Sequence, residues 1–162
     1  MTESREPAVF RRTELEQGLH LVATPIGSAR DITLRALDVL ASADVLAAED
    51  TRVLRRLMEL HGIPRGDRPV LSYHDHNGPA QRPRLLGLLA EGRSLAYASD
   101  AGTPLVADPG FRLAQAAIAA GHPVHAVPGP SSALAALSVA GLPTDRFLFA
   151  GFPPAQSAAR AR

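Results

Sequence analysis

Two adjacent carboxylates, Glu49 and Asp50, stand directly after the short apolar run Val45–Ala48. Neighbouring carboxylates of this kind can act as an acid–base pair, or they can accept a hydrogen bond from a ligand hydroxyl. Capping of the following helix explains them equally well, because carboxylates favour the positive end of a helix. The residues alone leave these interpretations open.

His74 and His76, with Asp75 between them, follow the apolar run Val70–Tyr73. Histidine and aspartate can bind a metal ion, but no further ligand is clustered nearby in the sequence, and cysteine is absent. We therefore expect no metal site. The sequence favours a place for these histidines on the substrate side of a pocket, or in hydrogen bonds to neighbouring loops.

Asp100–Gly110 is the most informative of the glycine- and proline-rich loops. Gly102 lets the backbone approach a ligand closely, Pro104 stiffens the turn, and Asp108 with the residues after it leads into a helix. Such backbone could hold an adenosine or a ligand carboxylate through N–H and C=O groups. The alternative is a long ordered turn capped by aspartate.

Two common nucleotide-binding motifs are missing. The first loop, Thr24–Ser28, lacks the G-x-G-x-x-G pattern that marks a dinucleotide site, and no G-K-[ST] occurs anywhere in the chain. These absences disfavour a nicotinamide-dependent dehydrogenase and a phosphate-binding P-loop.

The loops are positioned by short apolar runs that alternate with helix-length segments. This alternation predicts an α/β domain, a doubly wound, mostly parallel five-stranded sheet with helices on both faces. Ligands bind at the carboxyl ends of such strands, so five polar loops at that edge should outline one pocket. The predicted strands are 19–24, 45–48, 70–73, 94–99 and 124–127, with a further short one at 147–149. The predicted helices are 31–41 (capped by Asp31), 52–60, 84–90, 111–120 and 132–140.

The length of 162 residues fits one domain. We expect a flexible N-terminal arm over 1–17, an α/β domain over 18–152 and the start of a linker over 153–162. No run approaches the roughly 20 apolar residues that cross a bilayer, the N-terminus is polar, and cysteine is absent. These features predict a cytoplasmic protein with no membrane partner.

Positive charge is concentrated in one region, although the net charge is only +1. Between positions 52 and 84 lie seven arginines and three acidic residues. Arg52, Arg55 and Arg56 have the spacing that places side chains on one face of a helix. This face is either an ordinary solvated surface or a patch for an anionic partner such as RNA.

Five segments of the chain together resemble the tetrapyrrole methylase family, most closely its ribosomal branch. They occur in this order: LVATPIGSARDITLRAL (21–37), AAEDTR (47–52), SYHDHN (72–77), SDAGTPLVADPG (99–110) and VPGPSSALAALSVAGLPTDRFLFAGFPP (127–154). The resemblance implies a methyltransferase that uses S-adenosyl-L-methionine. For the ribosomal branch it implies transfer to the ribose 2′-hydroxyl of a decoding-site cytidine in the 16S rRNA of the small ribosomal subunit.

The resemblance also implies site residues and an assembly. The cofactor residues that it carries over are Pro25, Ile26 and Gly27, then Ala101, Gly102, Thr103 and Val106, and finally Ser131 and Ser132. Family members are usually homodimers and bind the cofactor between two α/β domains. The second domain is missing from this sequence, so we expect feeble cofactor binding and no turnover by this chain alone.

A ribose hydroxyl is a poor nucleophile, and a general base would help to remove its proton. The candidates are Asp100, Glu49, Asp50 and His74, and the sequence does not choose among them. Pro25-Ile26-Gly27 replaces the Gly-Pro-Gly of the corrin and sirohaem branch, which favours the ribosomal interpretation. Two alternatives stay open: methylation of a tetrapyrrole precursor of the uroporphyrinogen III type, and a non-catalytic module for dimerisation or RNA docking.

Overall fold

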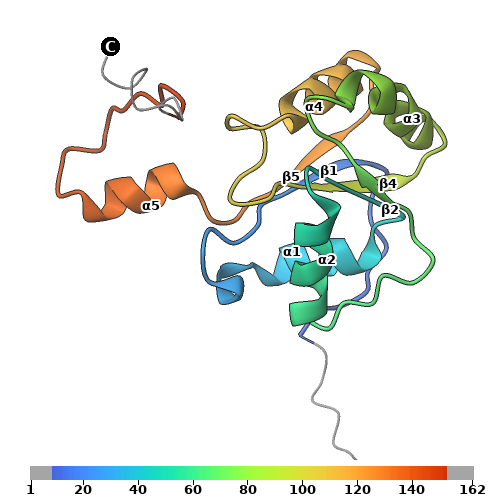
Figure 1. Ribbon diagram of the computed structural model, residues 1–162, viewed down its shortest axis with the longest axis horizontal. Helices are drawn as coiled ribbons and strands as arrows, with labels where there is room; N and C mark the ends of the chain where they lie inside the picture. Colours follow the sequence, from blue (N-terminus) through green and yellow to red (C-terminus); the bar gives the residue numbers. More distant parts are fainter. Residues whose placement is uncertain (1–8, 153–162) are drawn as a thin grey trace, which may run out of the picture.

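A computed structural model describes residues 9–152 of the chain. This part forms a five-stranded sheet between two pairs of helices (Figure 1). In chain order the elements are β1 (Gly18–Val22), a 3-10 helix (Ala29–Asp31), α1 (Leu34–Ser42), β2 (Val45–Ala48), α2 (Thr51–Leu60), β3 (Val70–Ser72), α3 (Gly78–Ala90), β4 (Ser94–Ala98), α4 (Gly110–Ala119), β5 (Val124–Val127) and α5 (Ser132–Val139).

All strands of the sheet run parallel, in the order β3-β2-β4-β1-β5. Every residue of β2 and β4 is buried. Their sequences, VLAA and SLAYA, are almost continuously apolar, which is typical of parallel strands covered by helices on both faces. The fold class predicted from the sequence is confirmed, and the sheet is wholly rather than mostly parallel.

The helices divide between the two faces of the sheet (Figure 1). Leu37 of α1 and Leu54 of α2 belong to the core on one face, whereas Leu85 of α3 and Leu113 of α4 pack with Tyr97 on the other. Right-handed crossovers produce this division, because the chain crosses the sheet in one direction through α1 and α2 and returns through α3 and α4. The helices after β1 and β2 therefore diverge from the helix after β4, and a crevice opens at the carboxyl ends of these neighbouring strands.

The start of α1 differs from the sequence prediction, which placed the cap at Asp31. Thr33 is the N-cap, and its hydroxyl accepts a hydrogen bond from the amide of Ala36 at 3.1 Å. Asp31 instead ends the 3-10 helix, which Ser28 caps. Both residue types are good caps and they stand two positions apart, so composition alone could not choose between them.

α3 begins at Gly78, well before the predicted start at position 84. Pro79 lies in the first turn, where its missing N–H costs nothing. Pro83 lies inside the helix and removes one backbone hydrogen bond, which is why the sequence pattern indicated a helix only after it.

Two segments near the end of the described chain, 147–149 and α5, differ from the packed layers. The strand predicted at 147–149 is wrong, because this stretch has no regular secondary structure. The predicted helix after β5 is present as α5, but it has no buried residue and stands away from the sheet (Figure 1).

The described part of the predicted arm, residues 9–17, contacts α1. The amide of Arg11 donates to the carboxylate of Asp38 at 2.6 Å, and the amide of Thr13 donates to the hydroxyl of Ser42 at 3.0 Å. Phe10 packs partly against the core on this face. The linker predicted over 153–162 lies outside the described residues. No helix within residues 9–152 has the length and apolar character to span a membrane.

Candidate functional site

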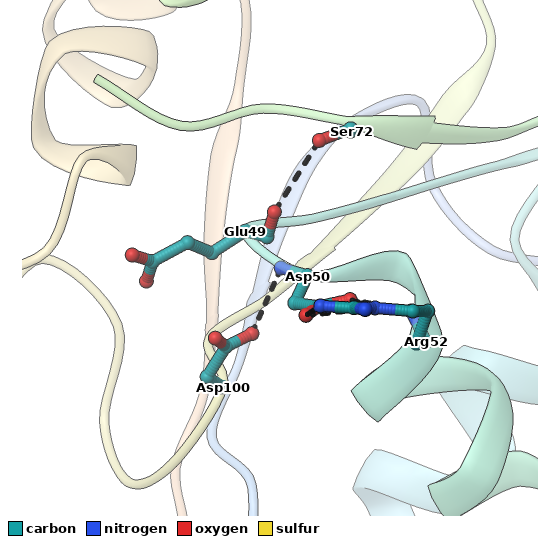
Figure 2. A network of polar contacts seen from close by, with 5 residues as sticks. All are labelled: Glu49, Asp50, Arg52, Ser72 and Asp100. Carbon is teal, nitrogen blue, oxygen red and sulfur yellow. Dashed lines mark hydrogen bonds and ion pairs between the residues drawn. The ribbon is translucent and has the colours of Figure 1, made fainter. Parts of the chain in front are cut away.

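The loops at the carboxyl edge of the sheet are joined in a row by hydrogen bonds. Between the ends of β3 and β2, the Ser72 hydroxyl donates to the carbonyl of Glu49 at 3.3 Å. Between the ends of β2 and β4, the amide of Asp50 donates to the carboxylate of Asp100 at 2.9 Å. Figure 2 shows both bonds. The loops after β3, β2 and β4 are thus held side by side, as the sequence predicted.

The row continues across the other half of the sheet. Thr24 and Gly102 exchange two backbone hydrogen bonds of 3.0 Å, which join the ends of β1 and β4. The hydroxyl of Thr103 donates to the carbonyl of Pro130 at 2.9 Å, which joins the loop after β4 to the loop after β5. All five strand ends therefore take part in one continuous edge.

Gly102 lies at the centre of a narrow cradle formed by the loops after β1, β4 and β5. Its φ is +80°, and a Cβ at this position would lie 3.3 Å from the side chain of Ile26 and 3.8 Å from the Pro130 carbonyl. The carbonyl of Gly102 accepts a hydrogen bond from the buried Ser99 hydroxyl at 2.7 Å. Only glycine combines this backbone conformation with so close an approach.

The cradle leaves several groups open to a ligand. Ala101, Thr103 and Val106 are exposed in the loop after β4. Ser131 is the N-cap residue of α5, and its side chain makes no capping hydrogen bond. The structure thus places residues that the sequence predicted to bind the cofactor around one cradle.

A pocket of about 490 Å³ opens beside this cradle, between the loop after β1 and one side of α2. We call it the α2 pocket. Pro25 and Gly27 line it from the first loop, and the carboxylates of Asp50 and Asp100 are part of its wall. The remaining lining residues are Ala29, Arg52, Val53, Arg56, Leu57 and Leu60.

The carboxylate of Asp50 has a structural role at the start of α2. As the N-cap it accepts a hydrogen bond from the amide of Arg52 at 2.8 Å, and the Arg52 guanidinium approaches it to 2.6 Å. The hydrogen bond from the Arg52 side chain is the main reason that the pKa of Asp50 falls to about 2. The capping role that the sequence left open for Asp50 is thereby found in the structure.

Glu49 behaves differently from its neighbour. Burial, reinforced by the negative charges of Asp100 and Asp108, raises the pKa of its carboxyl group. Its side chain extends away from the Asp50–Arg52 pair (Figure 2). The two adjacent carboxylates therefore differ in protonation behaviour, with Glu49 the one whose pKa moves toward neutral pH.

Asp108 forms a second polar contact inside the loop after β4. The hydroxyl of Tyr97 donates to its carboxylate at 3.0 Å, and the amide of Gly110 donates at 2.7 Å. Burial raises the pKa of Asp108 despite these donors. A Cβ on Gly110 would lie 2.3 Å from the Tyr97 ring, so this turn requires glycine. Asp108 thus shapes the loop by fixing the start of α4.

His74 does not line the α2 pocket. It lines a small hollow of about 20 Å³ with Arg82 and Arg112, beside the first turn of α3. Its backbone amide donates to the Asn77 side chain at 2.8 Å, and its ring packs edge-on against His76, with 5.9 Å between the ring centroids. Within residues 9–152, no three histidine, aspartate or glutamate side chains are grouped closely enough to hold a metal ion.

The arginines counted in the sequence do not form one patch. Arg68 turns inward and donates to the carbonyls of Leu40 and Ala43 at the end of α1, at 2.7 and 3.1 Å. Arg82 donates to the hydroxyl of Tyr73 at 3.1 Å on the opposite side of the sheet. Only Arg52 and Arg56 line the α2 pocket. Sequence counting could not separate these roles, since they depend on how the fold places each guanidinium against its partners.

The chain matches known proteins over most of its length. The family described as Tetrapyrrole (Corrin/Porphyrin) Methylases matches residues 18–155. The chain is 56% identical over 140 residues to the ribosomal RNA small subunit methyltransferase I of Mesorhizobium japonicum, covering 86% of this chain and 47% of that protein. Proteins of the same name from Xylella fastidiosa and Escherichia coli O157:H7 are 51% and 48% identical over 142 residues, covering 88% of this chain and 51% and 49% of theirs.

Solved structures share the fold. The uroporphyrin-III-C-methyltransferase of Thermus thermophilus is 33% identical with a TM-score of 0.57, over 78% of this chain and 54% of that protein. A conserved hypothetical protein of Aeropyrum pernix K1 is 27% identical with a TM-score of 0.64, over 82% of this chain and 46% of that protein. The chain spans about half the length of the curated relatives it matches.

Proposed function

The chain belongs to the tetrapyrrole (corrin/porphyrin) methylases, and on that premise we propose that it supplies the methyl-donor site of an S-adenosyl-L-methionine-dependent methyltransferase that acts on small-subunit ribosomal RNA. The observation that carries this proposal is the continuous row of hydrogen bonds from Ser72 to Pro130. It joins the five loops of the carboxyl edge into one row, in which the loops after β1, β4 and β5 form the cradle and those after β1, β2 and β4 line the α2 pocket. The family membership inferred from the sequence segments is confirmed.

The residues present fit an adenosine-bearing donor. The positive φ of Gly102 and its close approach to Ile26 leave a backbone surface that a side chain would fill. Ala101 and Thr103 are exposed beside it, and the hydroxyl of Ser131 makes no capping hydrogen bond to α5. Backbone amides and carbonyls of this kind hold adenosine and carboxylate groups well. S-adenosyl-L-methionine, when bound, supplies a methyl group that is already activated for transfer.

Because the methyl group is activated, the protein mainly has to position the acceptor and remove its proton. Among the four candidate bases, Glu49 is best suited. Its raised pKa brings it closer to neutral pH, whereas Asp50, with a pKa of about 2, is a weak base there. Asp100 accepts the Asp50 amide, and His74 lines a separate hollow. In our proposal Glu49 accepts the hydroxyl proton, and Asp100 positions the end of β2.

The names of the curated relatives favour ribosomal RNA as the acceptor, since those proteins are ribosomal RNA small subunit methyltransferases I. The expected target is the ribose 2′-hydroxyl of a decoding-site cytidine in 16S rRNA, with a homodimer as the expected assembly. A second candidate is a tetrapyrrole precursor of the uroporphyrinogen III type. It is supported by the structural likeness to a uroporphyrin-III-C-methyltransferase at 33% identity.

Two measurements test the proposal. Calorimetry with S-adenosylhomocysteine tests whether the chain binds the donor skeleton, and we expect saturable binding with a stoichiometry of about one. Transfer of labelled methyl groups by the whole protein is then compared on 30S ribosomal subunits and on uroporphyrinogen III. Labelling of the 30S RNA alone supports the proposal. Labelling of uroporphyrinogen alone, or RNA binding without any affinity for S-adenosylhomocysteine, rejects it and favours one of the alternatives.

A further inference from the structure

The α2 pocket has features that the donor cradle does not use. It shares Pro25 and Gly27 with the first loop, and from there it extends along two turns of α2 to Leu60. Its volume of about 490 Å³ lies in the range of small-molecule pockets. Three kinds of surface meet in it: carboxylates from the strand ends, an apolar wall, and guanidinium groups from α2.

The guanidinium groups come from Arg52 and Arg56, which are one helical turn apart and face the same side. Their side chains are 86% and 70% exposed. Arg52 is held in place by Asp50, whereas Arg56 makes only a loose ion pair with Glu59 at 3.6 Å. An exposed ion pair of this length contributes little stability, so a phosphate can take its place at small cost.

The apolar side chains of this wall are unusually exposed to solvent. Val53 is 42% exposed and Leu60 is 53% exposed, and both line the pocket beside the buried Leu57. A flat, neutral group placed against this wall would remove apolar surface from water. The wall and the arginines therefore suit a ligand with one apolar, uncharged part and one anionic part.

We propose that the α2 pocket receives a single nucleotide extruded from the RNA acceptor, with its base against Val53 and Leu60 and its flanking phosphates on Arg56 and Arg52. This inference rests on the function proposed above, because it names the subsite that holds the base and phosphates of the acceptor nucleotide; Glu49, the proposed base, is adjacent to Asp50 in the chain and is not itself among the residues that line the pocket. Enzymes that modify a structured nucleic acid commonly take the target nucleotide out of its stack. The phosphates stay at the rim of the pocket, and the neutral base lies inside it.

The charges inside the pocket favour a nucleotide over a tetrapyrrole precursor. A uroporphyrinogen carries many carboxylates, and these would meet the carboxylates of Asp50 and Asp100 with only two arginines to offset them. A nucleobase brings no negative charge to that end. Its amino groups can also donate hydrogen bonds to carboxylates, as cytosine does to aspartate or glutamate.

The first test measures binding of a short fluorescein-labelled RNA to the chain at several salt concentrations, by fluorescence anisotropy. Arg56→Ala should weaken binding several-fold and reduce the slope of log K against log salt by about 0.7, the contribution of one phosphate contact on a single strand. Arg84→Ala is the matched control, because Arg84 is exposed on α3 across the sheet. It should leave both quantities unchanged.

The second test asks whether a base enters the pocket. A fluorescent base analogue at the target position should change its emission on binding to the wild-type chain, and Leu60→Asp should abolish this change. Leu60 is exposed, so thermal unfolding of the variant should match that of the wild type. Equal effects of the Arg56 and Arg84 substitutions, no RNA binding by the wild type, or an emission change that Leu60→Asp leaves intact would each overturn the inference.

The outcomes separate this inference from the function on which it rests. S-adenosylhomocysteine binding should be the same in Arg56→Ala and wild type. If that binding and methyl transfer to RNA are normal while the Arg56 and Leu60 variants behave as wild type, only the pocket assignment fails. If S-adenosylhomocysteine does not bind and no RNA is methylated, the proposed function fails. If uroporphyrinogen III competes for the pocket and RNA does not bind, the acceptor is a tetrapyrrole.

Discussion

The backbone amide of Asp50 lies 2.9 Å from a carboxylate oxygen of Asp100 and donates a hydrogen bond to it. The bond joins the carboxyl ends of β2 and β4, which lie side by side in the sheet. It fixes the direction in which the chain leaves β2 and therefore the place of Glu49, the preceding residue. Asp100 thus orients Asp50 and Glu49 at this edge. The chemistry of the site depends on which of these three carboxylates remains available to accept a proton.

Glu49→Gln tests whether Glu49 removes the acceptor proton. Loss of a general base costs about 10²- to 10⁴-fold in rate, so we expect a fall in kcat of that size with little change in S-adenosylhomocysteine binding. The measurement is methyl transfer by the whole protein to 30S subunits. Glu91→Gln makes the same chemical change at an exposed position at the end of α3 and should keep the wild-type rate. A Glu49→Gln enzyme with normal kcat would remove Glu49 from the mechanism.

The same substitution should affect stability in the opposite direction. The folded state raises the pKa of Glu49, so it binds more protons at this group than the unfolded state does. Ionisation of Glu49 therefore lowers the free energy of unfolding as the pH rises from the unfolded pKa through the folded one. We expect Glu49→Gln to raise the melting temperature at neutral pH, and this gain should shrink below about pH 4, where glutamate is protonated in both states. A gain that is the same at every pH would contradict the charge argument.

Thr103 provides a test of the cradle. Its hydroxyl bonds the Pro130 carbonyl and holds the loops after β4 and β5 together. Thr103→Val keeps the shape of the side chain and removes this bond, so we expect weaker S-adenosylhomocysteine binding by calorimetry, by several-fold. Thr103→Ser keeps the hydroxyl and should bind nearly as the wild type does. A loss in Thr103→Ser with none in Thr103→Val would mean that the methyl group, and not the hydrogen bond, matters.

The sequence predicted the sheet and the position of its polar edge because both depend on local patterns. Runs such as VLAA and SLAYA are too apolar for an exposed strand, and glycine and proline mark the ends of the strands. The distinction between Glu49 and Asp50 was beyond the sequence. It arises from burial of one carboxylate and from the Arg52 side chain on the other. The role of Arg68 depends likewise on partners that the fold brings from the end of α1.

The correction at the start of α1 leads to a stability prediction. Thr33→Ala removes the hydroxyl that accepts the Ala36 amide, and loss of an N-cap of this type costs about 1 kcal/mol. Asp31→Ala should cost much less, because Asp31 is exposed and does not cap α1. Urea unfolding of the two variants measures both values. The reverse order of the two costs would restore Asp31 as the cap.

Arg68 should contribute to the stability of the fold and not to RNA binding. Its guanidinium donates to the carbonyls of Leu40 and Ala43, which lie in the last turn of α1 and just beyond it, and to the carbonyl of Pro64. Hydrogen bonds from a charged donor contribute more than neutral ones, so we expect Arg68→Ala to lower the free energy of unfolding by about 2 kcal/mol. The matched variant Arg55→Ala, at an exposed position of α2, should change it by less than about 0.5 kcal/mol.

The two variants also separate structural arginines from those that meet an anionic partner. At a temperature where Arg68→Ala remains folded, its affinity for RNA and its salt dependence should equal those of the wild type, since its donors are already bonded to backbone carbonyls. Arg56→Ala should show the opposite pattern, with normal stability and weaker RNA binding. A loss of RNA affinity in Arg68→Ala without any loss of stability would contradict this separation. It would show that RNA responds to the total positive charge of the region, and that the hydrogen bonds of individual arginines do not decide their roles.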